Sequence, residues 1–236
     1  MTLIQRLSCA LGVLLFVACG SESAEPASPE LEATSATEAP TEAPAETPEA
    51  PAEAPAAEGL ALGGSAPMSA TEMRNVDGTM HSIASVAKEK GTLVLFTCNH
   101  CPYAVAWQER YVALAHDFME QGIGVIAINS NDDTEYPSDS FEGTVARAAE
   151  LSMRFPYVMD ETSDVARAFG AEKTPEAYLF DAEGHLVYHG AVDDSQDPAG
   201  VQEHYLRDAL TAVAAGSAVA QAETNAVGCS IKFRES

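Results

Sequence analysis

A pair of cysteines between an apolar run and an amphipathic pattern is the feature that most constrains the fold. Residues 92–96 (TLVLF) have the length and composition of a buried strand. Cys98 and Cys101 follow, and from Ala104 to Phe118 apolar residues recur at intervals of three and four. The pattern predicts a strand, a short loop that carries both cysteines, and a long helix that ends before Gly122.

Strand and helix patterns continue to alternate along the rest of this part of the chain. An Asp-Gly turn at 77–78 predicts a hairpin between residues 73–76 and 79–83. Further strands are expected at 123–128, 157–159, 177–180 and 186–192, and helices at 141–153, 162–169 and 201–215. This order predicts a single α/β domain with a central mixed β-sheet flanked by helices.

Residues 20–58 have a different composition from the rest of the chain. They are almost entirely Ala, Glu, Pro, Thr and Ser, with no aromatic residue. Such a segment buries too little apolar surface to offset the entropy of ordering it, and its prolines and glutamates favour an extended chain. We therefore expect the folded domain at 59–236, with its core at 63–216 and a C-terminal tail at 217–236.

The N-terminus has the pattern of an export signal. Arg6 precedes an apolar run at 7–18, which is too short to span a bilayer as a helix and is typical of a signal peptide. Ala18-Cys19 at its end resembles a bacterial lipobox, which implies cleavage before Cys19 and lipidation of its thiol. The expected product is an exported lipoprotein that faces the periplasm or cell exterior, with residues 19–58 as its tether. Ordinary signal cleavage, with Cys19 incidental, is the alternative.

The charge of the chain excludes one class of partner. The formal net charge is −24, and residues 59–236 carry 26 acidic residues against 11 Lys and Arg. A polyanionic backbone would be repelled, so we expect no nucleic-acid partner.

Cys98 and Cys101 have the spacing of a redox-active pair. At the start of a helix, unpaired N–H groups and the helix dipole favour a thiolate, which is the nucleophilic form of cysteine. We expect Cys98 to attack a target disulfide and Cys101 to resolve the mixed disulfide, or the reverse reaction to oxidise a target dithiol. Asn99 and His100 lie between the cysteines, and His100 is positioned to tune the pair. If Cys98 caps the helix, Pro102 removes one helical hydrogen bond and produces a local kink.

A metal site is the main structural alternative for this motif. Zinc requires further ligands, and Cys229 with His100, His185 or His189 could supply them. The chain has no second Cys-x-x-Cys, however, so neither a metal nor any other cofactor is expected. A copper site at Cys98, Cys101 and a histidine is an equally minor alternative.

Five stretches together resemble the thioredoxin superfamily, specifically its peroxiredoxin-like (redoxin, AhpC/TSA-like) members with a Cys-x-x-Cys. They are residues 96–103 (FTCNHCPY), 127–132 (AINSND), 174–175 (TP), 179–184 (LFDAEG) and 227–232 (VGCSIK). The resemblance spans residues 63–216 and implies a thioredoxin-like fold. It also implies that Thr174-Pro175 is a cis peptide that faces the cysteines, with the Thr174 backbone available to pair with an extended substrate segment.

The chain departs from this family pattern at two places. Peroxiredoxins carry a Pro-x-x-x-Thr-x-x-Cys box, but Gly91 and Leu95 stand at its Pro and Thr positions before Cys98. The missing box argues against efficient peroxidase activity. Thioredoxins also carry a buried acid six residues before the first cysteine, where this chain has Thr92, so no proton acceptor for Cys101 is identified.

Cys229 is the remaining cysteine of the domain. It is either a third redox thiol on a mobile tail or a thiol with a structural role.

The leading hypothesis for the function is an envelope thiol–disulfide oxidoreductase that acts on thiol- or disulfide-containing proteins and exchanges electrons with a donor or acceptor protein. The alternatives are a peroxiredoxin-like thiol peroxidase and a non-enzymatic module that binds a metal or a partner.

Overall fold

The computed structural model describes residues 59–134 and 136–235. The expected signal peptide, Cys19 and the tether all lie outside the described residues. Within the part that is described, none of the helices has the length and apolarity needed to cross a bilayer.

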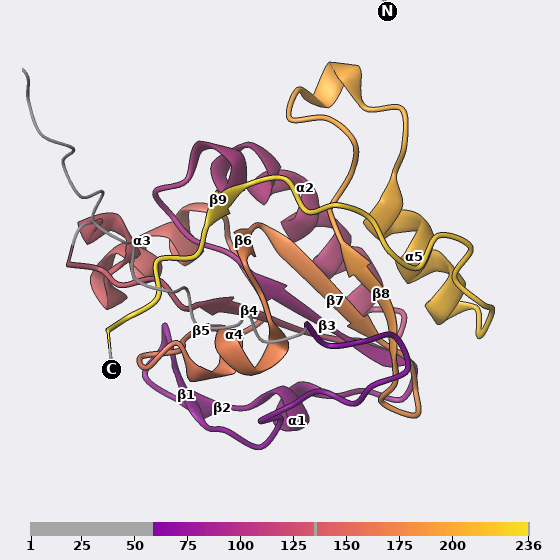
Figure 1. The fold of residues 1–236 in the computed structure, drawn as a ribbon, viewed down its shortest axis with the longest axis horizontal. Coiled ribbons are helices and arrows are strands. Elements are labelled where there is room, and N and C mark those ends of the chain that lie inside the picture. The colour runs from indigo at the N-terminus through magenta and orange to yellow at the C-terminus, as the bar shows by residue number, and fades with distance from the viewer. Residues whose placement is uncertain (1–58, 135, 236) are drawn as a thin grey trace, which may run out of the picture. The chain divides into compact units, whose positions relative to one another are not determined.

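A seven-stranded mixed sheet forms the centre of the domain (Figure 1). Its spatial order is β2-β1-β5-β4-β3-β7-β8. The strands are β1 (Met73–Asn75), β2 (Met80–His81), β3 (Gly91–Phe96), β4 (Ile123–Asn129), β5 (Tyr157–Met159), β7 (Glu176–Phe180) and β8 (Leu186–Gly190). β3, β4 and β5 are mutually parallel, whereas β1 and β7 run antiparallel to their neighbours.

Helices cover both faces of this sheet. They are α1 (Ile83–Val86), α2 (Pro102–Met119), α3 (Phe141–Glu150), α4 (Asp164–Phe169) and α5 (Tyr205–Ala214), with short 3-10 turns at Pro137–Asp139 and Pro198–Gly200. Because side chains alternate along a strand, Leu93 and Leu95 of β3 pack with α2 and α5, and Val94 and Phe96 pack with α1 and α4. This two-sided burial explains why β3 is apolar throughout and confirms the predicted α/β, thioredoxin-like fold.

The predicted strands and helices all appear in the structure in the predicted order, but α1, β6 and β9 were not predicted. The Asp-Gly hairpin forms between β1 and β2, where Gly78 has a φ of 84°. The last predicted helix was placed too early, because α5 begins at Tyr205 rather than at residue 201.

The start of α2 also differs from the expectation. Its N-cap is Cys101, not Cys98, and Pro102 is the first helical residue. The first N–H of a helix has no partner within it, so a proline there removes no hydrogen bond. The predicted loss of a bond at Pro102 is therefore wrong, and the first helical bond runs from Val105 N–H to the Cys101 carbonyl at 3.0 Å.

A second, two-stranded sheet joins the C-terminal tail to the domain. β6 (Lys173–Thr174) pairs antiparallel with β9 (Cys229–Ser230), with Thr174 opposite Cys229. Figure 1 shows the yellow tail crossing from α5 past β6 toward α3. The tail, which one of the two alternatives for Cys229 takes to be mobile, is hydrogen-bonded to the domain at Thr224 and Ile231.

Candidate functional site

The cysteine pair lies where β3 ends and α2 begins. Cys98 and Cys101 are both fully buried, and both are free thiols in the structure. Their sulfurs hydrogen-bond to each other. The spacing of two residues and the turn into α2 thus bring the thiols together, as the sequence predicted.

Thr174 and Pro175 lie next to this pair, and the peptide bond between them is cis. This confirms the expectation from the family resemblance. The Thr174 hydroxyl lies 3.0 Å from the Cys98 sulfur, and the Cys101 thiol donates to the Thr174 carbonyl at 3.5 Å. Thr174 thus contacts both sulfurs. Its backbone belongs to β6, which pairs with β9.

Cys229 completes a cluster of three thiols. Its backbone N–H donates to the Cys101 sulfur at 3.4 Å, and its side chain hydrogen-bonds to the same sulfur. Cys229 is half-buried, whereas the other two cysteines have no exposed surface. The structure therefore brings the third cysteine of the domain to the predicted site.

Asp139 is a buried carboxylate beside Cys98 that the sequence analysis missed. Its oxygens accept hydrogen bonds from the backbone N–H groups of Asn99 (2.6 Å) and His100 (3.2 Å) and from the Asn131 amide (2.9 Å). The Nδ1 atom of His100 also contacts this carboxylate, and the Tyr136 ring stacks on the imidazole. Asp139 thus fixes both the loop between the cysteines and the orientation of His100.

The Asn99 side chain points into the protein and makes different contacts from those of His100. Its amide donates to the Ser138 carbonyl (2.9 Å) and the Thr144 hydroxyl (3.0 Å), and its oxygen accepts from the Tyr157 hydroxyl (2.9 Å). These buried contacts turn the side chain into the protein, so Asn99 shapes the loop.

The surroundings of the two sulfurs shift their pKa values in opposite directions. The hydrogen bond with Cys101, burial and the negative charge of Asp139 raise the pKa of Cys98. The hydrogen bond from the Cys98 thiol, aided by the thiol and N–H of Cys229, lowers the pKa of Cys101. The shared proton therefore stays on Cys98. The helix start predicts a thiolate at Cys98, but with the tail in place the thiolate is favoured on Cys101.

One set of residues has the donor types of a metal site. Ligand atoms of Cys98, His100 and Asp139 lie within 4.8 Å of one another. A thiolate, an imidazole and a carboxylate suit zinc. The sequence suggested Cys229 and a histidine such as His189 as further ligands. Neither belongs to this set, because Cys229 lies beside Cys101 and His189 contacts Glu176 at 2.6 Å.

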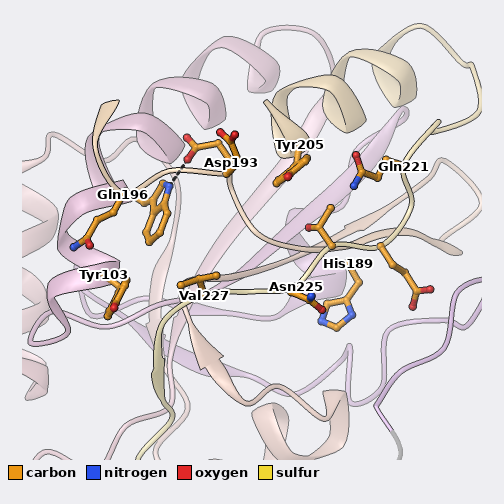
Figure 2. Close-up of a pocket in the computed structure, with 12 residues that line it drawn as sticks. Tyr103, His189, Asp193, Gln196, Tyr205, Gln221, Asn225 and Val227 are labelled. Carbon is orange, nitrogen blue, oxygen red and sulfur yellow. Dashed lines mark hydrogen bonds between the residues drawn. The ribbon is translucent and has the colours of Figure 1, made fainter. Parts of the chain in front are cut away.

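Residues of the tail line an open hollow. This hollow has a volume of about 760 Å³ and contains no cysteine. Figure 2 shows Tyr103 on one side, Asp193 and Tyr205 on another, and Asn225 and Val227 of the tail forming a wall. Attack by Cys98 on a target disulfide requires an accessible sulfur, but in the structure Cys98 and Cys101 are fully buried. β9 occupies the edge of β6 and contacts Cys101.

Comparisons with known proteins identify the family of the chain. A model of the AhpC/TSA family matches residues 63–189, more than half of the chain. Thiol-disulfide oxidoreductase ResA of Halalkalibacterium halodurans is 28% identical over 99 residues, which cover 42% of this chain and 52% of that protein. The chain thus spans about half the length of this curated relative.

Two solved structures are similar over most of their length. An uncharacterized conserved protein from Geobacillus kaustophilus is 39% identical with a TM-score of 0.71, and the match covers 76% of this chain and 95% of that one. A hypothetical protein from Sinorhizobium meliloti is 34% identical with a TM-score of 0.70, and the match covers 76% and 98%. The matched family model, the thioredoxin-like sheet and the cysteine pair opposite a cis-proline agree, and the chain belongs to the AhpC/TSA family of the thioredoxin superfamily.

Proposed function

We propose that this protein is a thiol–disulfide oxidoreductase that uses Cys98 and Cys101 on protein substrates. The observation that carries the proposal is the contact between two free thiols, both also touched by the residue before a cis-proline. Two adjacent thiols can close a disulfide and so exchange two electrons with another dithiol. ResA, whose name states this activity, supports the proposal.

The exchange proceeds through a mixed disulfide. In the reducing direction, Cys98 as a thiolate attacks one sulfur of the target disulfide and releases the other as a thiolate. Cys101 then attacks Cys98, closes the 98–101 disulfide and releases the second target thiol. Two electrons pass from the pair to the target, and the reverse sequence oxidises a target dithiol. His100, held by Asp139, is placed to receive the Cys98 proton.

Partner access requires the tail to leave the β6 edge. The backbone of Thr174 is then free to pair with an extended segment of the substrate. Undocking also removes the thiol and N–H of Cys229 from Cys101, which weakens the preference for a Cys101 thiolate and favours proton transfer away from Cys98.

Reduction of insulin disulfides by a dithiol-regenerated enzyme tests the proposal. Cys98→Ser and Cys101→Ser should each abolish the catalysed rate, because neither can form the internal disulfide. Cys19→Ser makes the same chemical change outside the domain and should leave the rate unchanged. Equal rates for wild type and Cys98→Ser would reject the proposed activity.

We also propose export and anchoring through Cys19, with residues 59–236 as the folded domain. The support is the sequence pattern at residues 1–19, and the setting fits a redox pair because disulfide chemistry persists outside the cytosol. In a bacterial host, wild type should incorporate labelled fatty acid and partition into detergent, whereas Cys19→Ser should do neither. Unlabelled wild-type protein in the aqueous phase would contradict the anchor.

A thiol peroxidase is the second candidate, because the chain belongs to the AhpC/TSA family. Gly91 and Leu95, which stand where peroxiredoxins have Pro and Thr, are buried in β3. A peroxidase would consume hydrogen peroxide with a thiol donor much faster than the donor alone.

A metal-binding role at Cys98, His100 and Asp139 is tested separately. The metal content of the protein is measured as purified and after zinc or copper addition, and stoichiometric metal would support that role.

A further inference from the structure

The tail that carries Cys229 fits closely against β6, and we call this contact between Gly228 and Thr174 the seat of the tail. Gly228 lies so close to β6 that a Cβ atom there would approach the Thr174 carbonyl oxygen to 2.1 Å. Only glycine permits this approach without displacing backbone. The seat therefore places residue 229, rather than either neighbour, opposite Thr174.

Hydrogen bonds fasten the tail on both sides of Cys229. Before it, the Thr224 N–H donates to the His189 carbonyl at 3.0 Å. After it, the Ile231 N–H donates to the Glu172 carbonyl at 2.9 Å, and the Lys232 N–H donates to the Asn131 side chain at 2.8 Å. Ile231 is also buried in the core beneath the sheet. These bonds hold the Cys229 thiol in contact with Cys101.

We propose that Cys229 is a third redox residue, which forms a disulfide with Cys101 by exchange with the 98–101 disulfide. The inference rests on the proposed function and extends it to an internal relay. β9 occupies the position in which a substrate segment would pair with Thr174, and it presents a cysteine there. The tail thus acts on the pair as a tethered substrate.

The exchange is balanced without an added oxidant. The Cys229 thiolate attacks the Cys101 sulfur of the oxidised pair, the 101–229 bond forms, and the 98–101 bond breaks to release Cys98 as a thiolate. The Cys229 proton passes to solvent or to the released Cys98. The disulfide moves from two fully buried sulfurs to one that includes half-buried Cys229, where an external dithiol can attack it.

A single-turnover trap in the full chain tests the contact directly. Cys98→Ser removes the competing disulfide, so oxidation with glutathione disulfide should join Cys101 to Cys229 through a mixed disulfide with glutathione. The control combines Cys98→Ser with Cys229→Ser and Ser230→Cys, which moves the thiol one residue along the tail. Because successive residues of a strand face opposite sides, the moved thiol points away from Cys101.

Peptide mapping by mass spectrometry should find at least about tenfold more 101–229 disulfide in Cys98→Ser than 101–230 disulfide in the control across glutathione ratios. In wild type, both the 98–101 and the 101–229 disulfides should appear. Equal cross-linking in Cys98→Ser and the control would overturn the inference.

The two proposals fail in different ways. If Cys229→Ser reduces insulin like wild type, and no 101–229 disulfide forms in wild type or in Cys98→Ser, the relay is rejected and the oxidoreductase stands. If the Cys98→Ser chain forms the 101–229 disulfide but wild type never reduces insulin, the oxidoreductase is rejected and the thiol contact remains.

Discussion

At the scale of single residues, Asp139 determines the environment of Cys98. Its carboxylate is fully buried, receives the N–H groups of Asn99 and His100, and orients the His100 ring. A negative charge so close to a buried thiol opposes its ionisation. Asp139 thus opposes the free Cys98 thiolate. In the proposed mechanism the same carboxylate holds His100 as the acceptor of the Cys98 proton.

We therefore expect Asp139→Asn to have opposite effects on ionisation and turnover. With Cys101→Ser and Cys229→Ser as background, the thiolate absorbance of Cys98 should appear at lower pH, because the repelling charge is gone. In the otherwise unaltered chain, insulin reduction should slow by about tenfold or more, because the proton acceptor loses its support.

Asp160→Asn is the matched control for this prediction. Asp160 is also a buried carboxyl, but it bonds to the Ser130 hydroxyl and the Ala166 N–H instead of the cysteine loop. Its removal should leave the pH profile of Cys98 unchanged. A profile that does not move in Asp139→Asn would show that the carboxylate has no electrostatic contact with the thiol.

The sequence revealed the sulfurs but not their surroundings. Cys98 and Cys101 have a recognisable spacing, and Thr174-Pro175 is found through the family resemblance. Asp139 lies 38 residues after Cys101 in a polar segment that was expected to be a loop, without a pattern that ties it to the cysteines. The thioredoxin position for a buried acid is Thr92, so a search at that position could not find an acid supplied by another segment.

At the scale of elements, Glu176 links three strands around the cis-proline. Its carboxylate accepts the Glu172 and Lys173 N–H groups at 2.9 Å each and contacts His189 of β8 at 2.6 Å. Burial raises the pKa of this carboxyl, but these hydrogen bonds outweigh it and lower the pKa below its ordinary value of 4.5. Glu176 thus favours the folded state only while it is ionised.

This shift predicts a stability that depends on pH. Ionised Glu176 stabilises the fold above pH 4.5, and this contribution is lost as the pH falls through the lowered pKa of the folded state. Glu176→Gln should lower the free energy of unfolding by about 2 kcal/mol at neutral pH, and by progressively less below the ordinary value. Urea unfolding at several pH values measures the difference.

Glu183→Gln provides the control, since Glu183 is exposed in the turn between β7 and β8. It should change the unfolding free energy little at any pH. A Glu176→Gln deficit that stays constant down to acid pH would mean that shape, rather than charge, gives Glu176 its effect.

Elements were more predictable than their ends. Apolar runs such as residues 92–96 locate buried strands because a strand covered on both faces has no polar side. The cap of α2 was misplaced by three residues, because the turn from Cys98 to Cys101 is held by Asp139, a tertiary contact. The pairing of β9 with β6 was not predicted, since a two-residue strand has no periodicity to recognise.

At the scale of the whole molecule, the tail lies against Cys101 of the buried pair, and we expect it to limit access to both thiols. Gly228→Ala should unseat it, because the added Cβ has no room beside Thr174. Alkylation of Cys98 and Cys101 in the reduced protein should then accelerate by about tenfold or more, as expected when a covering segment opens at lower cost. Mass spectrometry of timed quenches resolves the individual cysteines.

Gly59→Ala is the control for this substitution. A Cβ at Gly59 would meet only atoms at 3.9 Å or beyond, so its alkylation rates should match those of wild type. Unchanged protection of Cys98 in Gly228→Ala would place the barrier to access elsewhere in the domain.

The charge of the domain makes a prediction about its partners. Acidic residues outnumber basic ones from 59 to 236, and Asp193, Asp194 and Glu223 line the hollow beside the tail. A potential of one sign concentrates substrates of the opposite sign and accelerates their encounter. A peptide disulfide flanked by lysines should therefore react about tenfold faster at low salt than its glutamate-flanked counterpart. High salt should remove most of this ratio, because surface charges are then screened. A ratio near one at low salt would mean that the acidic surface serves solubility and does not select partners.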